Sequence, residues 1–237
     1  VKSSAASDVY KRQDDDENQL SITDGYWGGQ YNHDWADYDN DGDLDLVSGG
    51  ISIFDNTNYL TIFKNNNGIL SKDTIQTDLI PLFPCALIWI DINGDNYKDL
   101  LTLGRFQLNG VSHMYINDGM GKLIKSSDQP FEIPSILHAI SVGDHNSDGY
   151  DDIAIAHLNG TEMHTNIYTN EYGSSSINEF SLHQELQGAT YASLDWGDYD
   201  NDGDLDLVTS GYTATSTTDQ GSEAVSYTHL TLPTTSP

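Results

Sequence analysis

The sequence predicts an all-β protein: a β-propeller fragment with about three complete four-stranded blades plus a partial one. The first reason is an acidic segment of eleven residues that occurs four times at nearly constant spacing. The second is that short apolar runs, rich in Ile, Val, Tyr and Thr, alternate with Gly, Asn and Asp turns, as strands do. The third is that no stretch shows sustained helical periodicity with capping residues.

The four acidic segments begin at Asp37, Asp91, Asp144 and Asp198, so the steps between them are 54, 53 and 54 residues. Apolar residues follow each segment directly. Two residues before each first aspartate stand Trp35, Trp89, Val142 and Trp196. We expect these tryptophans to pack between neighbouring blades.

A second element recurs further along each repeat. An aromatic residue is followed two positions later by Asn, in the pairs Phe63/Asn65, Tyr115/Asn117 and Tyr168/Asn170. In the first two repeats Asn67-Gly68 and Asp118-Gly119 come next, and such pairs favour hairpin turns. Each repeat therefore holds about four strands, and four strands in a period near 50 residues are typical of propeller blades.

The two ends differ from the repeats. Residues 1–13 and 225–237 resemble translated sequencing-adapter DNA, read from opposite strands, and such segments are excluded from reasoning about the fold. The expected natural segment is residues 14–224. Its acidic loops span residues 37–45, 91–99, 144–152 and 198–206.

The charge of the chain limits its partners. It has 9 Lys+Arg and 37 Asp+Glu, for a net charge of −28. So acidic a chain disfavours nucleic acid and anionic membrane surfaces as partners. No apolar run is long enough to predict membrane insertion. Cys85 is the only cysteine, so the chain has no intrachain disulfide.

The acidic loops have the composition of a calcium site, because Ca²⁺ takes six to eight oxygen ligands from carboxylates, amides and carbonyls. Positions 1, 3, 5 and 9 are Asp or Asn in every copy, and position 7 varies, as expected if only its carbonyl binds. Gly42, Gly149 and Gly203 at position 6 supply a positive φ, and Asn96 replaces them in the second loop. The ligands expected at positions 1, 3, 5, 7 and 9 are Asp37, Asp39, Asp41, Asp43 and Asp45; Asp91, Asn93, Asp95, Tyr97 and Asp99; Asp144, Asn146, Asp148, Tyr150 and Asp152; and Asp198, Asp200, Asp202, Asp204 and Asp206.

Three alternatives compete with this interpretation. An EF-hand loop carries an acid at position 12 and is framed by helices, but position 12 here is Ser48, Thr102, Ile155 or Thr209. Magnesium keeps its waters and rarely uses all-protein cages. A solvated Asp-Asn-Gly turn would explain one copy better than it explains four.

The pattern Trp-x-Asp-x-Asp-x-Asp-Gly-x-x-Asp-Leu-Val resembles the FG-GAP and VCBS repeats of integrin α-subunit propellers and of bacterial surface and secreted proteins. The resemblance covers about residues 31–211. It implies a propeller of about seven blades, with calcium in the loop that joins the first two strands of each blade. The second loop departs from the pattern at Gly94 and Asn96, and the Phe-Gly and Gly-Ala-Pro signatures of integrins are absent. The bacterial form is therefore the closer likeness.

Two functions remain open at this point. The first is a calcium-stabilised extracellular module for adhesion or recognition, secreted or on the cell surface, that binds a protein or glycan. The second is a non-catalytic propeller appended to, or part of, a secreted enzyme such as a polysaccharide lyase or hydrolase. The first is favoured because the recurring polar residues serve metal and turns. No catalytic motif is found, and the histidines show no ligand spacing shared between repeats, so we expect no enzyme activity.

Overall fold

A computed structural model describes residues 33–51, 57–82, 86–106, 109–126, 136–159, 162–172, 180–213 and 222–228. In these ranges the chain forms fifteen strands and no helix. The strands make four antiparallel sheets, three with four strands and one with three. In each sheet the strands lie side by side in chain order, so every sheet is a simple meander, as expected for a propeller blade.

We refer to the four sheets as blades 1 to 4. Blade 1 contains β1 (His33–Ala36), β2 (Asp45–Ile51), β3 (Asn58–Asn66) and β4 (Ile69–Lys72). Blade 2 contains β5 (Ala86–Ile90), β6 (Asp99–Phe106), β7 (Asn109–Asn117) and β8 (Leu123–Lys125). Blade 3 contains β9 (Ile136–Gly143), β10 (Asp152–Asn159), β11 (Glu162–Asn170) and β12 (Phe180–Gln187). Blade 4 contains β13 (Thr190–Gly197), β14 (Asp206–Thr213) and β15 (Ser222–Thr228).

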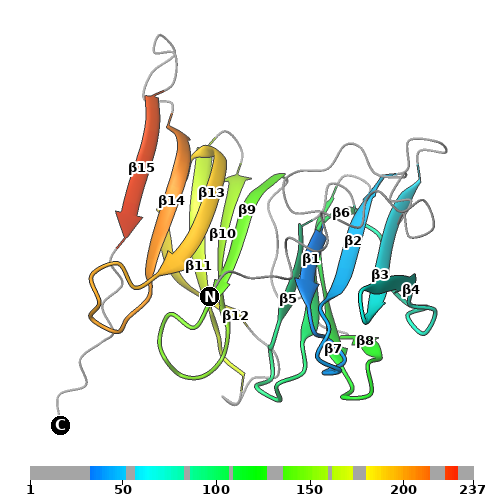
Figure 1. Ribbon diagram of the computed structural model, residues 1–237. Helices are drawn as coiled ribbons and strands as arrows, with labels where there is room; N and C mark the ends of the chain where they lie inside the picture. Colours follow the sequence, from blue (N-terminus) through cyan, green and yellow to red (C-terminus); the bar gives the residue numbers. More distant parts are fainter. Residues whose placement is uncertain are drawn as a thin grey trace.

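The blades follow one another in an open arc, with β15 and β4 at opposite ends of the view in Figure 1. The first strand of each blade contacts the first strand of the next, from β1 to β5, β9 and β13. This arrangement confirms the predicted fold class, a propeller fragment of three blades and a partial fourth. The expected 224/225 boundary falls within β15, whose backbone pairs with β14 as far as Thr228. Residues 1–13 and 229–237, and Cys85, lie outside the described ranges.

Three hydrophobic cores fill the three junctions between successive blades. Neighbouring residues of one strand serve opposite junctions, because side chains alternate between the faces of a sheet. Trp89 and Leu100 face blade 1, whereas Ile90 and Leu101 face blade 3. Both faces of blades 2 and 3 are therefore buried, and this explains why their second strands are apolar without alternation.

The expected packing of the tryptophans holds only where a preceding blade covers them. Trp89 is 6% exposed in the first core, and Trp196 is half-buried against blade 3. Trp35 is 40% exposed. Its side chain faces away from blade 2, since its neighbour Ala36 belongs to the core on that side. The prediction is therefore wrong for Trp35 in this structure.

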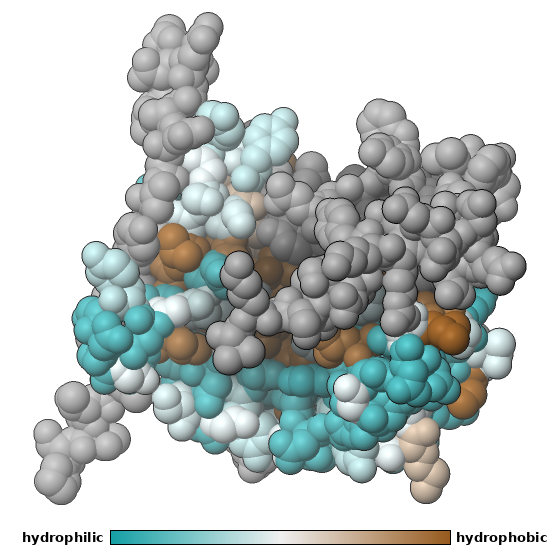
Figure 2. Space-filling model, in the orientation of Figure 1, coloured by the Kyte–Doolittle hydropathy of each residue, from teal (hydrophilic) through white to brown (hydrophobic). Residues whose placement is uncertain are grey.

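All four acidic loops lie along one edge of the arc, the lower edge in Figure 1, where each joins the first strand of a blade to the second. In the same orientation, Figure 2 shows hydrophilic residues gathered along this lower edge, with apolar residues above them. Within the described residues, no helix has the length and apolar character that a membrane span requires.

Candidate metal centres

The four loops share one backbone fold, which is organised by the aspartate at position 1. One oxygen of its carboxylate accepts the N–H of position 5 and the other accepts the N–H of position 6. In the first loop both bonds to Asp37 are 3.0 Å long, and in the third those to Asp144 are 3.0 and 2.9 Å. In the second loop the bonds to Asp91 are 3.2 and 2.8 Å, and in the fourth those to Asp198 are 3.1 and 3.2 Å. Position 1 therefore folds the loop around its own carboxylate.

Two residues of each loop adopt positive φ angles, which lets the chain curl inward. Position 6 does so in every loop, as predicted, and Asn96 with φ 67° replaces glycine there. Position 4 does so as well, and this was not foreseen. Asn40, Ser147 and Asn201 occupy it in three loops, and Gly94 does so in the second. Gly94 therefore suits its conformation, and the second loop keeps the common fold despite its departure from the sequence pattern.

The aspartate at position 9 is a buried anchor at the start of the second strand. In the first three loops one carboxylate oxygen accepts the N–H of the recurring Asn on the third strand. Those bonds are 2.7 Å from Asn65 to Asp45, 2.7 Å from Asn117 to Asp99 and 2.8 Å from Asn170 to Asp152. The other oxygen accepts the N–H of position 2, for example Ile92 at 3.0 Å. Because a strand follows position 9 directly, the loops are not EF-hands.

Burial raises the pKa of three of these anchors. The pKa of Asp45 is raised to about 6, and those of Asp99 and Asp152 to about 7. The neighbouring loop carboxylates raise these pKa values further, whereas the backbone N–H donors lower them. Each anchor therefore sits in a strongly negative site where a cation would displace its proton.

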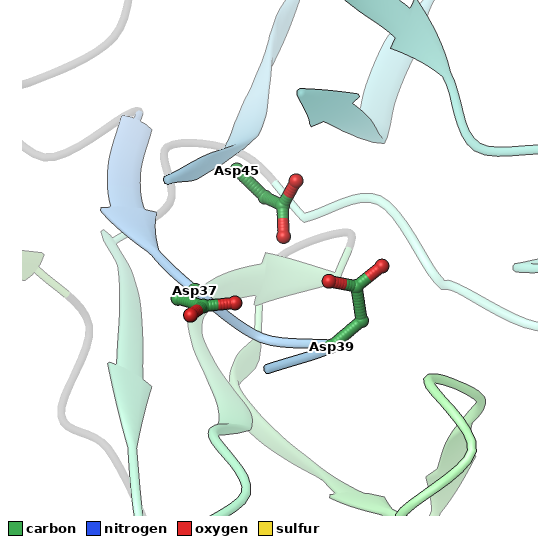
Figure 3. A group of neighbouring side chains, drawn as sticks. All are labelled: Asp37, Asp39 and Asp45. Atoms are coloured by element: carbon green, nitrogen blue, oxygen red, sulfur yellow. The ribbon is translucent and has the colours of Figure 1, made fainter. Parts of the chain in front are cut away.

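In the first and fourth loops, the carboxylates of positions 1, 3 and 9 converge. One oxygen each of Asp37, Asp39 and Asp45 lies within 4.8 Å of the others, and the same holds for Asp198, Asp200 and Asp206. Figure 3 shows the first group: Asp37 at the end of β1, Asp39 in the loop and Asp45 at the start of β2. Oxygens bound to one calcium ion at 2.3–2.6 Å lie at most about 5 Å apart. The two groups therefore fit Ca²⁺.

Asp39 supplies an independent sign that the first loop suits a cation. Its Oδ1 is buried without a hydrogen-bond partner. Its Oδ2 accepts a hydrogen bond of 3.0 Å from Lys64 on β3, and this ammonium lies 5.3 Å from the centre of the Tyr38 ring. A buried carboxylate oxygen without a partner is costly, and a bound cation would satisfy it.

The second and third loops carry an amide at position 3. Asn93 Nδ2 donates to Asp95 Oδ2 at 3.0 Å, and Asn146 Nδ2 donates to Asp148 Oδ2 at 2.9 Å. The amide oxygens accept the N–H of position 5 at 3.0 Å in both loops. Positions 3 and 5 are thus brought together, and each site has one carboxylate fewer than in the first and fourth loops.

Positions 5 and 7 lie at the exposed turn of each loop. The carboxylate of position 5 accepts the N–H of position 7 in all four, at 2.9 Å from Asp43 to Asp41 and 3.0 Å from Asp204 to Asp202. The same bond is 2.9 Å from Tyr97 to Asp95 and from Tyr150 to Asp148. At position 7 the Asp43 carboxylate accepts the N–H of Asn67 at 2.6 Å and does not belong to the group formed by positions 1, 3 and 9. The backbone at position 7 therefore remains the expected ligand.

The recurring Asn of the third strand has a second role that sequence reasoning missed. Asn117 Nδ2, in blade 2, donates to the carbonyl of Tyr38 in the first loop at 2.7 Å. Asn170, in blade 3, does the same to Ile92 in the second loop at 2.8 Å. Its recurrence two residues after an aromatic residue was the available signal. Blades 2 and 3 thus each hold position 2 of the preceding loop.

A buried hydrogen-bond network between blades 1 and 2 was also missed, because it occurs only once. The Tyr38 hydroxyl donates to Asp73 Oδ2 at 2.7 Å. Gln76 Nε2 donates to the same oxygen at 3.0 Å and to the Gly121 carbonyl of blade 2 at 2.6 Å. Burial and the neighbouring Asp73 raise the pKa of Tyr38, so the hydroxyl stays protonated. The network closes blade 2 over the first loop.

The fold and the loops define a class: propeller-like β-repeat proteins with an acidic loop after the first strand of each blade. The FG-GAP-like repeat model matches the chain three times in succession, over residues 37–102, 91–155 and 144–209. The chain therefore belongs to the FG-GAP-like repeat family, and the resemblance noted in the sequence is confirmed. No curated protein matches it.

Proposed function

We propose that this chain is a calcium-stabilised binding module of an extracellular, secreted or cell-surface protein, that it recognises a protein or glycan, and that it has no enzyme activity. The observation that carries the proposal is the convergence of position-1, -3 and -9 carboxylates, together with the partnerless Asp39 Oδ1. Membership of the FG-GAP-like repeat family supports it, because such repeats commonly bind calcium and serve adhesion or recognition.

In each loop positions 1, 3, 5 and 9 would hold the ion through side-chain oxygens, and position 7 through its carbonyl. Bound calcium would offset part of the charge of the three or four carboxylates that otherwise repel one another in one turn. The protein's own residues then act structurally: position 9 ties the site to the core, and position 1 orders the turn. The acidic edge becomes a rigid row of loops, and rigid loops on a β-scaffold are suited to recognition.

Calcium titration calorimetry on the whole chain tests the metal proposal. The wild type should bind several ions, at roughly 10⁻⁴ to 10⁻³ M, as extracellular modules do. Asp37→Ala and Asp198→Ala should each remove one ion from the stoichiometry. The matched controls are Asp43→Asn and Asp204→Asn at position 7, which should bind as many calcium ions as the wild type. No calcium binding by the wild type, or equal losses at positions 1 and 7, would contradict the proposal.

A further inference from the structure

A pair of histidines outside the acidic loops faces each other across two strands of blade 3. His157 on β10 and His164 on β11 are direct partners in the antiparallel register, so their side chains share one face of the sheet. Their rings are nearly parallel, with centroids 5.7 Å apart. Ile155, two residues before His157, belongs to the core between blades 2 and 3. The pair therefore lies on the blade 3 face that packs against blade 2.

His157 poses a problem that the fold itself does not solve. It is 3% exposed, and neither Nδ1 nor Nε2 has a hydrogen-bond partner. Neutral imidazole carries one N–H donor and one acceptor, and buried polar groups are normally satisfied. On the same face Oδ1 of Asn166 is also buried, and this amide lies close enough to raise the pKa of His157, although the pair lacks good hydrogen-bond geometry. Asn166 Oδ1 can accept from one ring nitrogen only, so at least one buried nitrogen of His157 is left without a partner.

His164, unlike His157, has a carboxylate as a hydrogen-bond partner. Its Nδ1 lies 2.8 Å from Oε1 of Glu185 on β12. A carboxylate at Nδ1 fixes the tautomer that leaves Nε2 free, and histidines that bind metals commonly have this outer partner. The side chains of His164 and Glu185 are 20% and 55% exposed. The sequence His157, His164, Glu185 therefore runs from the core to solvent and gives an ion a path inward.

We infer that His157 and His164 form a binding site for a divalent transition metal of the zinc type, with Glu185 as the outer carboxylate and Asn166 Oδ1 beside it. Imidazole nitrogens suit zinc, copper and nickel, whereas calcium prefers oxygen. The chemistry of this site is thus distinct from that of the acidic loops. Burial and the nearby His164 lower the pKa of His157, so its ring is neutral and able to ligate near pH 7. Rotation of the partly exposed His164 side chain would bring both rings onto one ion.

Zinc titration calorimetry of the whole chain, without a polyhistidine tag and in millimolar calcium to fill the carboxylate loops, tests this site. The wild type should bind one zinc ion, and His164→Gln should lose it. Glu185→Gln should bind about 10- to 100-fold more weakly, as outer-carboxylate variants do. His33→Gln, an exposed histidine at the start of β1, is the control and should match the wild type. A thermal unfolding transition like that of the wild type, recorded without zinc, confirms that each variant folds.

Copper(II) bound in place of zinc supplies a second readout, since nitrogen ligands give hyperfine splitting in its electron paramagnetic resonance spectrum. This splitting should be present in the wild type and in His33→Gln and lost in His164→Gln. Zinc binding that persists unchanged in His164→Gln would place the ion elsewhere and overturn the inference. No zinc binding by the wild type would also overturn it, and would mean that water or Asn166 satisfies His157.

Discussion

The first and fourth loops have the same sequence over eleven residues, Asp37–Val47 and Asp198–Val208, yet they lie in different surroundings. Tyr38 at position 2 of the first loop is fully buried, whereas Tyr199 at position 2 of the fourth is 75% exposed. The cause is the neighbour. Blade 2 covers the first loop through Asn117 and through Gly121, whose carbonyl accepts from Gln76, and no described residue of a following blade covers the fourth.

The carboxylate at position 9 is also more buried in the first loop than in the fourth, but the difference is smaller. Asp45 is fully buried and Asp206 is 6% exposed, because position 9 is enclosed by its own blade. Both loops still bring positions 1, 3 and 9 together. Local sequence therefore determines the shape of the metal site, while the next blade determines how well it is shielded from water.

Chelation of calcium should have the largest effect. At about 10 mM calcium, which is 100 times a Kd of about 10⁻⁴ M, a ligand that binds only the folded state stabilises it by about 2.7 kcal/mol per site. Emptying each site should therefore lower the Tm by about 5–11 °C in a domain of this size. Amide hydrogen exchange should rise more at Gly203 than at Gly42, because the fourth loop is uncovered. An unchanged Tm after chelation would contradict calcium stabilisation. Equal amide exchange at Gly42 and Gly203 would show that blade 2 does not protect the first loop.

Removal of the tyrosine hydroxyl at position 2 should lower the free energy of unfolding much more in the first loop than in the fourth. Tyr38→Phe leaves the buried Asp73 carboxylate short of a donor, and hydrogen bonds to charged groups contribute about 1.5–3 kcal/mol. Tyr199→Phe alters an exposed side chain and should change the free energy of unfolding by less than about 0.5 kcal/mol. Urea denaturation of both variants measures the difference. Similar losses for both would show that blade 2 does not act on the first loop as described.

Proton release should accompany calcium binding, because the pKa of Asp45 is about 6 and those of Asp99 and Asp152 are about 7. Near pH 6.5 about one to two protons should leave per chain, measured by calorimetry in buffers of different ionisation enthalpy. Without calcium these raised pKa values stabilise the fold fully below about pH 3.8, and that contribution is lost as the pH rises to about 7. Binding heats that do not depend on the buffer would contradict this.

The smallest expected effect on calcium affinity comes from Lys64. Its ammonium binds the position-3 carboxylate of the first loop, Asp39. Its side chain is 29% exposed, so the ion pair is partly screened and worth less than about 1 kcal/mol. Lys64→Gln removes a cation that competes for Asp39, and should raise the calcium affinity of the first loop about two- to fivefold. The Gly42 amide resonance reports the first loop, and the Gly203 amide serves as the internal control. A weaker first loop would show that Lys64 supports the site.

Much of this architecture was predictable because the repeat carries local chemistry. The acidic loops, the positive φ at position 6 and the strand after position 9 follow from residues within eleven positions of each other. What could not be predicted depends on register and on neighbours. Trp35 and Trp89 stand at the same position before their acidic loops, but Trp89 packs against described residues of a preceding blade and Trp35 does not.

The other misses have the same origin. His157 and His164 looked like single strand histidines because their repeats share no spacing, and only the register of β10 against β11 makes them partners. Asn117 was noticed as a recurring residue, but its acceptor, the Tyr38 carbonyl, lies 79 residues earlier in the chain. Lys64 and Asp73 occur in one blade alone, so no repeat drew attention to them.

That distance of 79 residues has a consequence for how the protein is made. The first loop leaves the ribosome well before the asparagine that will hold it, and at about 5–20 residues per second the delay is roughly 4–16 s. During that interval the turn has only its own carboxylates and the surrounding ions to order it. The first and second loops therefore become fully held only after the next blade has been made, so the order of synthesis sets the order in which this part of the acidic edge becomes rigid.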